Sequence, residues 1–408
     1  MPRRTPRRPL CGEALPGGGK CRNYADTCPH RPHSRRAAAG ASLPTASRPP
    51  RVVPPALAAA AWPDPVLSDW FGQAAAHLGL DERQIIHDYW LVRGLYEVSK
   101  MIGPSGVLQN PYTQTRVGQL VLGGGTSLSA AWDIAPRYSE DIDLILIPYP
   151  DVAARRVKHS IKAFARDLAR RMNAPLLVDS RGPRHCFFRL PVAGGDDISV
   201  DVTVKAISSS RPILILPEPV GSLTARTAPE ELLARHPELG RPRGPDNRGA
   251  LGPSFRVPVL GPCSTAMDKL LAQTNLSLNG TSSQIKARAR DIYDLACIAR
   301  SAELFEGHIG RDSARLLHIA QQARLNADAA IRPVDGFATL ASFTPGTWQW
   351  EALRGGYQTV ADELVWGDRI DFERAITLAV SLDPGPAQGP PTDPPPEILG
   401  VAWPEREH

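Results

Sequence analysis

The first well-patterned segment of the chain, residues 81–102, places apolar side chains at helical spacing. The apolar positions that share one helical face are Ile85, Tyr89, Val92, Leu95, Tyr96 and Val98. Asp81 stands directly before them, where a short acidic side chain can cap the first free N–H groups of a helix. The pattern predicts an amphipathic helix that begins at Asp81. A second helix, with a basic polar face, is predicted over residues 151–172.

Short apolar runs predict β-strands between and after these helices. The runs comprise residues 119–122, 140–147, 175–179, 185–190 and 197–205. A glycine turn and a helix start rich in hydroxyl side chains follow the first run. The order of strands and helices indicates an α/β or α+β sheet domain. Nearly everything from about residue 263 onward has helical periodicity, and we predict an α+β protein. A sheet domain with flanking helices is expected over residues 66–220, and a mostly helical domain over residues 221–382.

The two ends of the chain differ from this body in composition. Residues 1–55 contain eleven Lys and Arg and only two acidic residues, a local charge of +9 in a chain whose total is +5. They also hold eleven of the 41 prolines, and residues 384–408 hold eight more. High charge and high proline content disfavour a packed core. We therefore predict a basic tail over residues 1–65 and a disordered Pro-rich tail over residues 383–408.

Three cysteines and two histidines lie close together in the basic tail. They are Cys11, Cys21, Cys28, His30 and His33. This stretch is too polar and too short for a core of its own, and it resembles small Cys3His zinc knuckles, in which a metal ion replaces the missing core. Two interpretations stay open: a structural Zn²⁺ site with either histidine as fourth ligand, and a tail without metal. The remaining cysteines stand far apart, as expected of reduced thiols in a cytosolic protein: Cys186, Cys263 and Cys297.

The hydropathy of the chain indicates whether it crosses a membrane or carries a signal peptide. No apolar run reaches the roughly 18 residues that a membrane-spanning helix needs. The Arg- and Pro-rich start also lacks the apolar segment of a signal peptide. The sequence therefore predicts a cytoplasmic protein without membrane contact.

Two aspartates interrupt the apolar run at residues 140–147. Side chains two residues apart in a strand point to the same face, so Asp141 and Asp143 project together. Two carboxylates so close repel each other, and each raises the pKa of the other unless a positive charge joins them. Mg²⁺ or Mn²⁺ supplies that charge and also binds phosphate oxygens. Asp201, in the strand predicted over residues 197–205, is the expected third metal ligand.

The glycine turn before this strand suits a phosphate group. Gly123, Gly124 and Gly125 let backbone N–H groups approach a ligand without a Cβ in the way. The helix that begins near Thr126 or Ser127 directs its positive end to the same place. Together with the carboxylates, the turn predicts a site for a nucleoside triphosphate.

Residues 124–144, GGTSLSAAWDIAPRYSEDIDL, resemble the signature of the AbiEii- and MenT-type nucleotidyltransferase toxins, a branch of the DNA polymerase β-like superfamily. That family also has a lysine on a helix and, farther along, an Arg-Asp-x-Tyr-Asp-Leu helix. Lys269 and Asp291 occupy these positions. The resemblance covers residues 80–300 and implies a polymerase β-like sheet domain followed by a helical domain.

The resemblance also implies roles for single residues. Asp141 and Asp143 would hold the metal ion, Lys269 would contact the triphosphate and Asp291 would assist catalysis. The residues that would line the nucleotide site are Gly124, Gly125, Thr126, Ser127 and Ser139.

Helical periodicity separates the two aspartates of the last motif. The apolar stripe of the helix predicted over residues 284–299 leaves Asp291 at its flank and Asp294 facing away. Asp291 is therefore the predicted catalytic residue of this helix.

These observations predict a metal-dependent nucleotidyltransferase that moves a nucleoside monophosphate from a triphosphate to an acceptor hydroxyl. The resemblance implies a tRNA 3′ end or another RNA as acceptor, the toxin role of a type IV-like toxin–antitoxin system, and a cognate antitoxin as partner. Two alternatives stay open. One is a small-molecule, antibiotic-type nucleotidyltransferase with the same metal site, and the other is a non-catalytic nucleic-acid-binding protein that relies on the basic tail.

Overall fold

The structure is a computed structural model that describes residues 65–110, 113–181, 185–192, 196–204, 215–241, 255–304 and 336–382. All of these residues belong to one compact unit, Pro55–His408. The Pro-rich tail and the five candidate zinc ligands lie outside the described residues, so the zinc site stays a prediction. Among the described residues, no helix combines the length and the apolar character needed to cross a membrane.

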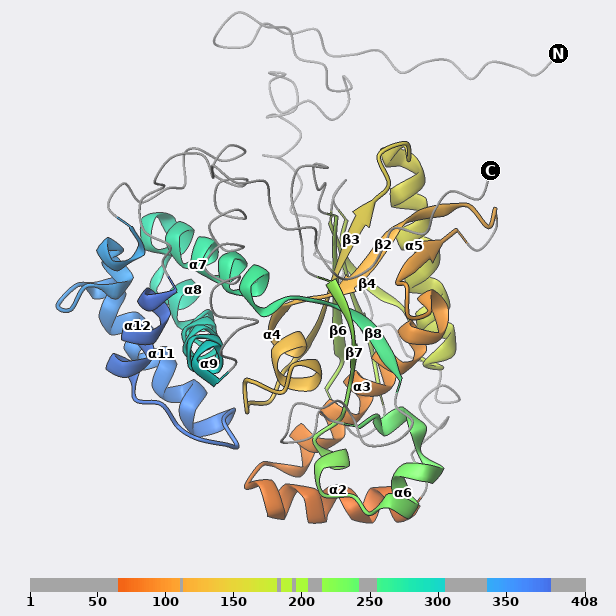
Figure 1. The fold of residues 1–408 in the computed structure, drawn as a ribbon, viewed down its shortest axis with the longest axis horizontal. Coiled ribbons are helices and arrows are strands. Elements are labelled where there is room, and N and C mark those ends of the chain that lie inside the picture. The colour runs from red at the N-terminus through yellow and green to blue at the C-terminus, as the bar shows by residue number, and fades with distance from the viewer. Residues whose placement is uncertain are drawn as a thin grey trace, which may run out of the picture. The chain divides into compact units, whose positions relative to one another are not determined.

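A mixed sheet of eight strands runs through the described part of this unit (Figure 1). The strands are β1 (Val107–Gln109), β2 (Arg116–Leu122), β3 (Asp141–Pro148), β4 (Leu177–Arg181), β5 (His185–Leu190), β6 (Ile198–Val204), β7 (Ile215–Pro219) and β8 (Arg256–Leu260). Their order is β4-β5-β6-β3-β2-β8-β7, and β1 pairs with the N-terminal part of β2, between Arg116 and Gln119. β3 is parallel to β6 and β2 is parallel to β8, while the other neighbours are antiparallel.

Helices flank the sheet in two groups. Those from the first half of the chain are α2 (Pro65–Leu78), α3 (Glu82–Ile102), the short α4 (Gly124–Thr126) and α5 (Ala154–Arg171), followed later by α6 (Glu230–Arg235). Those from the second half are α7 (Pro262–Asn279), α8 (Ser282–Ala287), α9 (Arg290–Leu304), α11 (Trp348–Glu363) and α12 (Phe372–Ser381). The second group packs together, with α9 in contact with α7, α11 and α12 (Figure 1).

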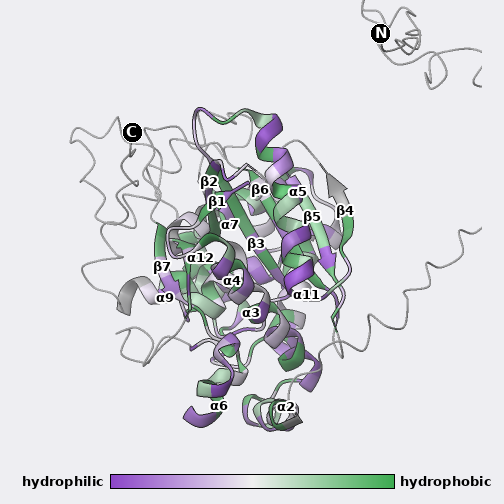
Figure 2. Cartoon of the chain, turned by 90° about the vertical axis from the view of Figure 1, so that its right-hand side faces the viewer, coloured by the Kyte–Doolittle hydropathy of each residue, from purple (hydrophilic) through white to green (hydrophobic). Residues whose placement is uncertain are grey.

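Helices α3 and α5 cover one face of the sheet. The side chains of β3 that point toward them are apolar and buried, as Ile142, Leu144 and Leu146 show. A Cβ at Gly94 of α3 would lie 3.1 Å from Ile142 Cδ1, so this helix packs directly on the strand. Figure 2 shows the hydrophobic strands of the sheet and the hydrophilic residues along the adjacent helices. Asp141 and Asp143 point to the opposite face and are only partly buried.

The most regularly patterned segments form the predicted helices and strands. The first helix is confirmed as α3 with Asp81 as N-cap, and all five predicted strands are present. Three further strands, β1, β7 and β8, are not evident from the sequence pattern. β8 lies beyond residue 220 and nevertheless pairs with β2 in the sheet. The helix predicted over residues 284–299 is interrupted, because α8 ends at Ala287 and α9 begins at Arg290.

The N-terminus of α3 depends on a reciprocal pair of hydrogen bonds. Asp81 Oδ1 accepts from the N–H of Arg83 (2.8 Å), and the N–H of Asp81 donates to Gln84 Oε1 (3.0 Å). Two backbone N–H groups that helix geometry leaves without an internal partner are satisfied in this way. Asp81 therefore fixes where α3 begins.

The Asp81→Ala variant is expected to lose about 1 kcal/mol of unfolding free energy, because the first N–H groups of α3 lose their acceptor. Denaturant unfolding followed by circular dichroism measures the change. Asp81→Asn, which keeps a capping oxygen, is the control and should stay close to the wild type. An equal loss in both variants would contradict capping as the cause.

Candidate active site

The glycine turn after β2 brings the backbone into direct contact with a site carboxylate. Gly123 donates its N–H to the carbonyl oxygen of Asp143 (2.8 Å). Gly124 has a φ of 63°, and a Cβ at this position would overlap Oδ2 of Asp143. Only glycine combines the left-handed conformation with so close an approach. The turn therefore lies directly against the Asp143 carboxylate.

Hydroxyl groups hold this turn against the start of β3. Thr126 Oγ1 lies 2.8 Å from Ser139 Oγ and donates to the carbonyl oxygen of Asp141. Ser127 Oγ donates to the carbonyl oxygen of Gly124 (2.7 Å). Thr126 and Ser127 are fully buried. Their hydroxyls orient the turn, and they are not among the residues that line the cavity described below.

Three carboxylates lie on the face of the sheet that α3 and α5 leave uncovered. Asp201 of β6 pairs with Asp143 of β3 in parallel register. The side chains of Asp141 and Asp201 are 32% and 31% exposed, and Asp201 Oδ1 lies 2.8 Å from His185 Nε2. In the part of the chain that the structure describes, no group of three or more His, Cys, Asp or Glu side chains is arranged to hold a metal ion. The predicted trio thus shares one wall without converging on a common point.

Partial burial and like charge both act on the Asp143 carboxyl. Burial raises the pKa of its carboxyl above the ordinary value, and the negative charge of Asp141 raises this pKa further. The positive charges of Lys269 and Arg290 act in the opposite direction without cancelling these effects. Additional positive charge is therefore stabilising at this point of the site.

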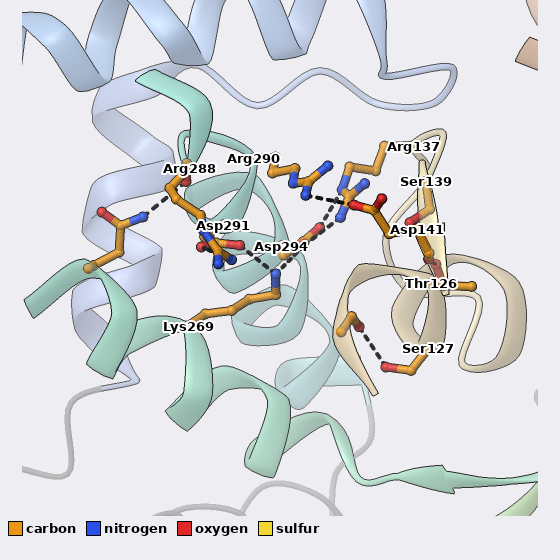
Figure 3. A network of polar contacts seen from close by, with 12 residues as sticks. Thr126, Ser127, Arg137, Ser139, Asp141, Lys269, Arg288, Arg290, Asp291 and Asp294 are labelled. Atoms are coloured by element: carbon orange, nitrogen blue, oxygen red, sulfur yellow. Dashed lines mark hydrogen bonds and ion pairs between the residues drawn. The ribbon is translucent and has the colours of Figure 1, made fainter. Parts of the chain in front are cut away.

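A buried network of ion pairs joins the segment before β3 to α7 and α9 (Figure 3). Arg137 donates from Nε to Asp294 Oδ1 (2.6 Å) and from Nη2 to Asp294 Oδ2 (2.7 Å). The ammonium nitrogen of Lys269 lies 2.6 Å from Asp291 Oδ1 and 2.8 Å from Asp294 Oδ2. None of the four side chains is more than 9% exposed. Asp294 thus bridges Arg137 and Lys269.

The charges of this network stabilise one another. Burial alone would raise the pKa of Asp294, but Arg137 and Lys269 outweigh it and hold this pKa below its usual range. Burial alone would likewise lower the pKa of Lys269, but Asp291 and Asp294 outweigh it and raise that pKa. Asp294 and Lys269 therefore both stay ionised at neutral pH although water is excluded.

Arg290 connects α9 to the carboxylates of β3. Its Nη1 lies 2.5 Å from Glu140 Oε2, and its Nη2 lies 3.2 Å from Asp141 Oδ2. Arg288, whose side chain is 54% exposed, lies 3.6 Å from Asp291 Oδ2 through Nη1. Arg290 thus reaches from α9 to the carboxylates of the sheet, whereas Arg288, between α8 and α9, lies near Asp291 (Figure 3).

These elements enclose a cavity of about 460 Å³. The predicted site residues that line it are Gly124, Gly125, Ser139, Asp141, Asp143, Asp201, Lys269 and Asp291. Two buried oxygens at its wall, Thr265 Oγ1 and Asp291 Oδ2, have no hydrogen-bond partner among the described residues. Buried polar atoms in folded proteins are normally paired. Asp291 Oδ2 keeps the longer ion-pair contact with Arg288 Nη1 described above.

The prediction that Asp294 faces away from the core is wrong. Asp294 is fully buried, because α9 packs against α7 on one side and against α11 and α12 on others, which leaves no solvent face. An apolar stripe identifies only one covered side of a helix. Periodicity also assigns no role to Arg137, the partner of Asp294, although this residue stands two positions before Ser-Glu-Asp-Ile-Asp.

The fold and site define a nucleotidyltransferase, with a glycine turn against paired strand aspartates opposite a lysine-bearing helix. The sequence model of the family described as "Nucleotidyl transferase AbiEii toxin, Type IV TA system" matches residues 114–372, and the chain belongs to this family. The match extends well beyond residue 300, where the recognised motifs end.

One solved structure similar to the chain is MenT4, a nucleotidyltransferase toxin from Mycobacterium tuberculosis H37Rv. The two sequences are 17% identical, the alignment covers 76% of this chain and 93% of that chain, and the TM-score is 0.38. No curated protein sequence matches the chain.

The Gly124→Ala variant is expected to lose nucleotidyl transfer almost entirely, because the new Cβ displaces the Asp143 carboxylate and strains a left-handed residue. Gly123→Ala is the matched control. A Cβ at Gly123 meets only the end of the Ile145 side chain, at 3.0 Å, and this variant should keep most activity. Initial rates and melting temperatures of both proteins provide the measurement. Equal activities would contradict the proposed contact.

The Asp294→Asn variant is expected to lose roughly 3–5 kcal/mol of unfolding free energy at pH 7, because Arg137 and Lys269 lose a buried partner. The pKa of Asp294 is depressed in the folded state. Its contribution to the unfolding free energy is therefore complete above the pKa of the unfolded state, about 3.9. The contribution is lost as pH falls through the lower pKa of the folded state.

Denaturant unfolding between pH 3 and pH 8 tests this expectation. The difference in unfolding free energy between the wild type and Asp294→Asn should become smaller only at the acidic end of the pH series. Asp368→Asn, at an exposed aspartate paired with Arg300, is the control and should change little. A gap that is constant across the whole pH range would argue against an ionic role for Asp294.

Proposed function

We propose that this nucleotidyltransferase uses Mg²⁺ or Mn²⁺ to transfer a nucleoside monophosphate from a nucleoside triphosphate to a hydroxyl at the 3′ end of tRNA or another RNA. We further propose that it acts as a cytoplasmic toxin that a cognate antitoxin counteracts. The observation that carries the proposal is the contact of Gly124 with Asp143, beside Asp141 and across the cavity from Lys269. A phosphate-binding turn is thereby joined to a candidate pair of metal ligands.

The donor atoms of Asp141 and Asp143 suit a divalent cation. Asp141 and Asp143 offer hard carboxylate oxygens on one face of β3, with Asp201 on the neighbouring strand. The cavity is lined by four basic side chains and five carboxylates, so its wall has no positive excess for a triphosphate. When bound, the cation would neutralise phosphate oxygens and favour attack at the α-phosphorus.

The chain's own groups bind and orient the triphosphate. The glycine turn presents backbone N–H groups without side chains, and Ser139 lies beside it in the cavity wall. Lys269 uses two of its three ammonium N–H groups on Asp291 and Asp294, which leaves the third for a phosphate oxygen. Asp291 positions Lys269, so its contribution to catalysis acts through the lysine.

Arg290 supplies a second basic group to the proposed site. Its guanidinium lies against Asp141 and neutralises part of the carboxylate charge. If Asp141 held a divalent cation, the planar guanidinium would be available to phosphate oxygens in the same cavity.

The test is transfer by the full chain with each of four labelled triphosphates, total RNA and Mg²⁺ or Mn²⁺. One triphosphate should label RNA of tRNA size, and chelation should abolish the signal. Asp141→Ala should lower the rate by about 10³-fold or more, because several kcal/mol of transition-state stabilisation is lost.

Asp368→Ala, at a surface aspartate, is the control for this assay and should keep its activity. Near-wild-type turnover of Asp141→Ala would refute the metal site. Labelling of aminoglycosides in place of RNA would identify a small-molecule nucleotidyltransferase instead.

A further inference from the structure

The row of side chains that contains the carboxylates continues onto β5. In the register of the sheet, Asp143 pairs with Asp201, and Asp201 pairs with Phe187. Residues directly opposite on neighbouring strands project from the same face. Phe187 therefore lies two strand spacings, about 10 Å, from Asp143. All three side chains line the same cavity.

Phe187 is an aromatic side chain that the core does not use. Its neighbours Cys186 and Phe188 point to the other face of the sheet and are 7% and 0% exposed. Phe187 is only partly buried and stands at the wall of a cavity whose other lining residues are mostly polar. A ring in this position gains free energy when a flat apolar ligand surface covers it.

The order of groups across the sheet separates the leaving group from the attacking group. The glycine turn follows β2, on one side of Asp143, whereas Asp201 and Phe187 lie on the other side. In phosphoryl transfer the attacking and leaving oxygens are roughly in line, on opposite sides of the phosphorus. With the pyrophosphate end of the triphosphate at the glycine turn, the attacking hydroxyl arrives from the side of Phe187.

We propose that Phe187 forms a nucleobase subsite for the acceptor, in which its ring stacks on the terminal base of an RNA strand. This inference rests on the proposed function and specifies which surface receives the acceptor. The acceptor hydroxyl passes its proton to water and its oxygen bonds to the α-phosphorus. The bond from that phosphorus to the bridging oxygen breaks, and pyrophosphate leaves with the electron pair. Stacking makes and breaks no bond, and it tolerates any base because every base has a π-face.

The kinetic test compares acceptor RNA that ends in an ordinary nucleotide with the same RNA that ends in an abasic residue. Phe187→Ala should raise KM for the ordinary acceptor by about 5- to 150-fold, the range for one stacked base, with an unchanged KM for the triphosphate. The abasic acceptor should bind wild type and Phe187→Ala equally. Phe187→Trp should keep KM for the ordinary acceptor close to the wild-type value. Phe187→Leu, whose side chain is apolar but has no ring, should show the raised KM.

A second measurement does not depend on activity. A short oligoribonucleotide with 2-aminopurine at its 3′ end should lose fluorescence on binding the full-length protein, because stacking quenches this base. Phe187→Ala should abolish the quenching, while Trp348→Ala, at an aromatic side chain that is 54% exposed and outside the cavity, should leave it intact. Melting temperatures show whether each variant is folded.

Each outcome decides the question. Quenching that persists in Phe187→Ala would overturn the subsite, as would a raised KM for the triphosphate with an unchanged KM for the acceptor. If the wild type transfers nothing to RNA, the proposed function fails. The 2-aminopurine measurement then still decides whether Phe187 receives a base, since loss of quenching supports the subsite and its persistence refutes it.

Discussion

The contact between Arg137 and Asp294 is the constraint on which the rest of the site depends. Both side chains are excluded from water, and an unpaired charge there costs several kcal/mol, so the segment before β3 and helix α9 have to meet. Arg137 also lies where a Cβ at Gly125 would be, so the same guanidinium packs against the glycine turn. One arginine thereby sets the position of the turn relative to α9. Lys269 is fixed next, since Asp294 accepts from both cations.

The arrangement of charge follows from this contact. Lys269 and Arg290 stand on the helical wall, and Asp141 and Asp143 stand on the strand wall. Arg290 reaches across to Asp141 at 3.2 Å, whereas Lys269 stays with the carboxylates of its own wall. The two basic groups therefore differ in their partners. Arg290 is paired with a carboxylate of the strand wall, and Lys269 is paired with carboxylates of the helical wall.

Sequence alone is sufficient where one periodic pattern decides the structure. The capped helix at Asp81 and the alternation that puts Asp141 and Asp143 on one face are of this kind, because both depend on near neighbours in the chain. The burial of Asp294 depends on how α9 packs against three other helices, which local spacing does not contain. Thr126 and Ser127 are a related case. Their hydroxyl groups suit a ligand, but in the structure they donate to carbonyl oxygens of β3 and of the glycine turn. The short strand β8 gave no clear periodic signal, and its pairing with β2 is long-range.

The segment after α11 explains why the family match continues past the recognised motifs. The N–H of Tyr138 donates to the carbonyl oxygen of Leu364 (2.8 Å), and the N–H of Trp366 donates to that of Pro136 (3.2 Å). These bonds lie on either side of Arg137 in the chain, and Arg137 itself forms a β-bridge with Val365. A side chain that must keep two hydrogen bonds to Asp294 needs a backbone that does not shift. The segment after α11 thus supports the candidate active site although the cavity lining includes none of its residues.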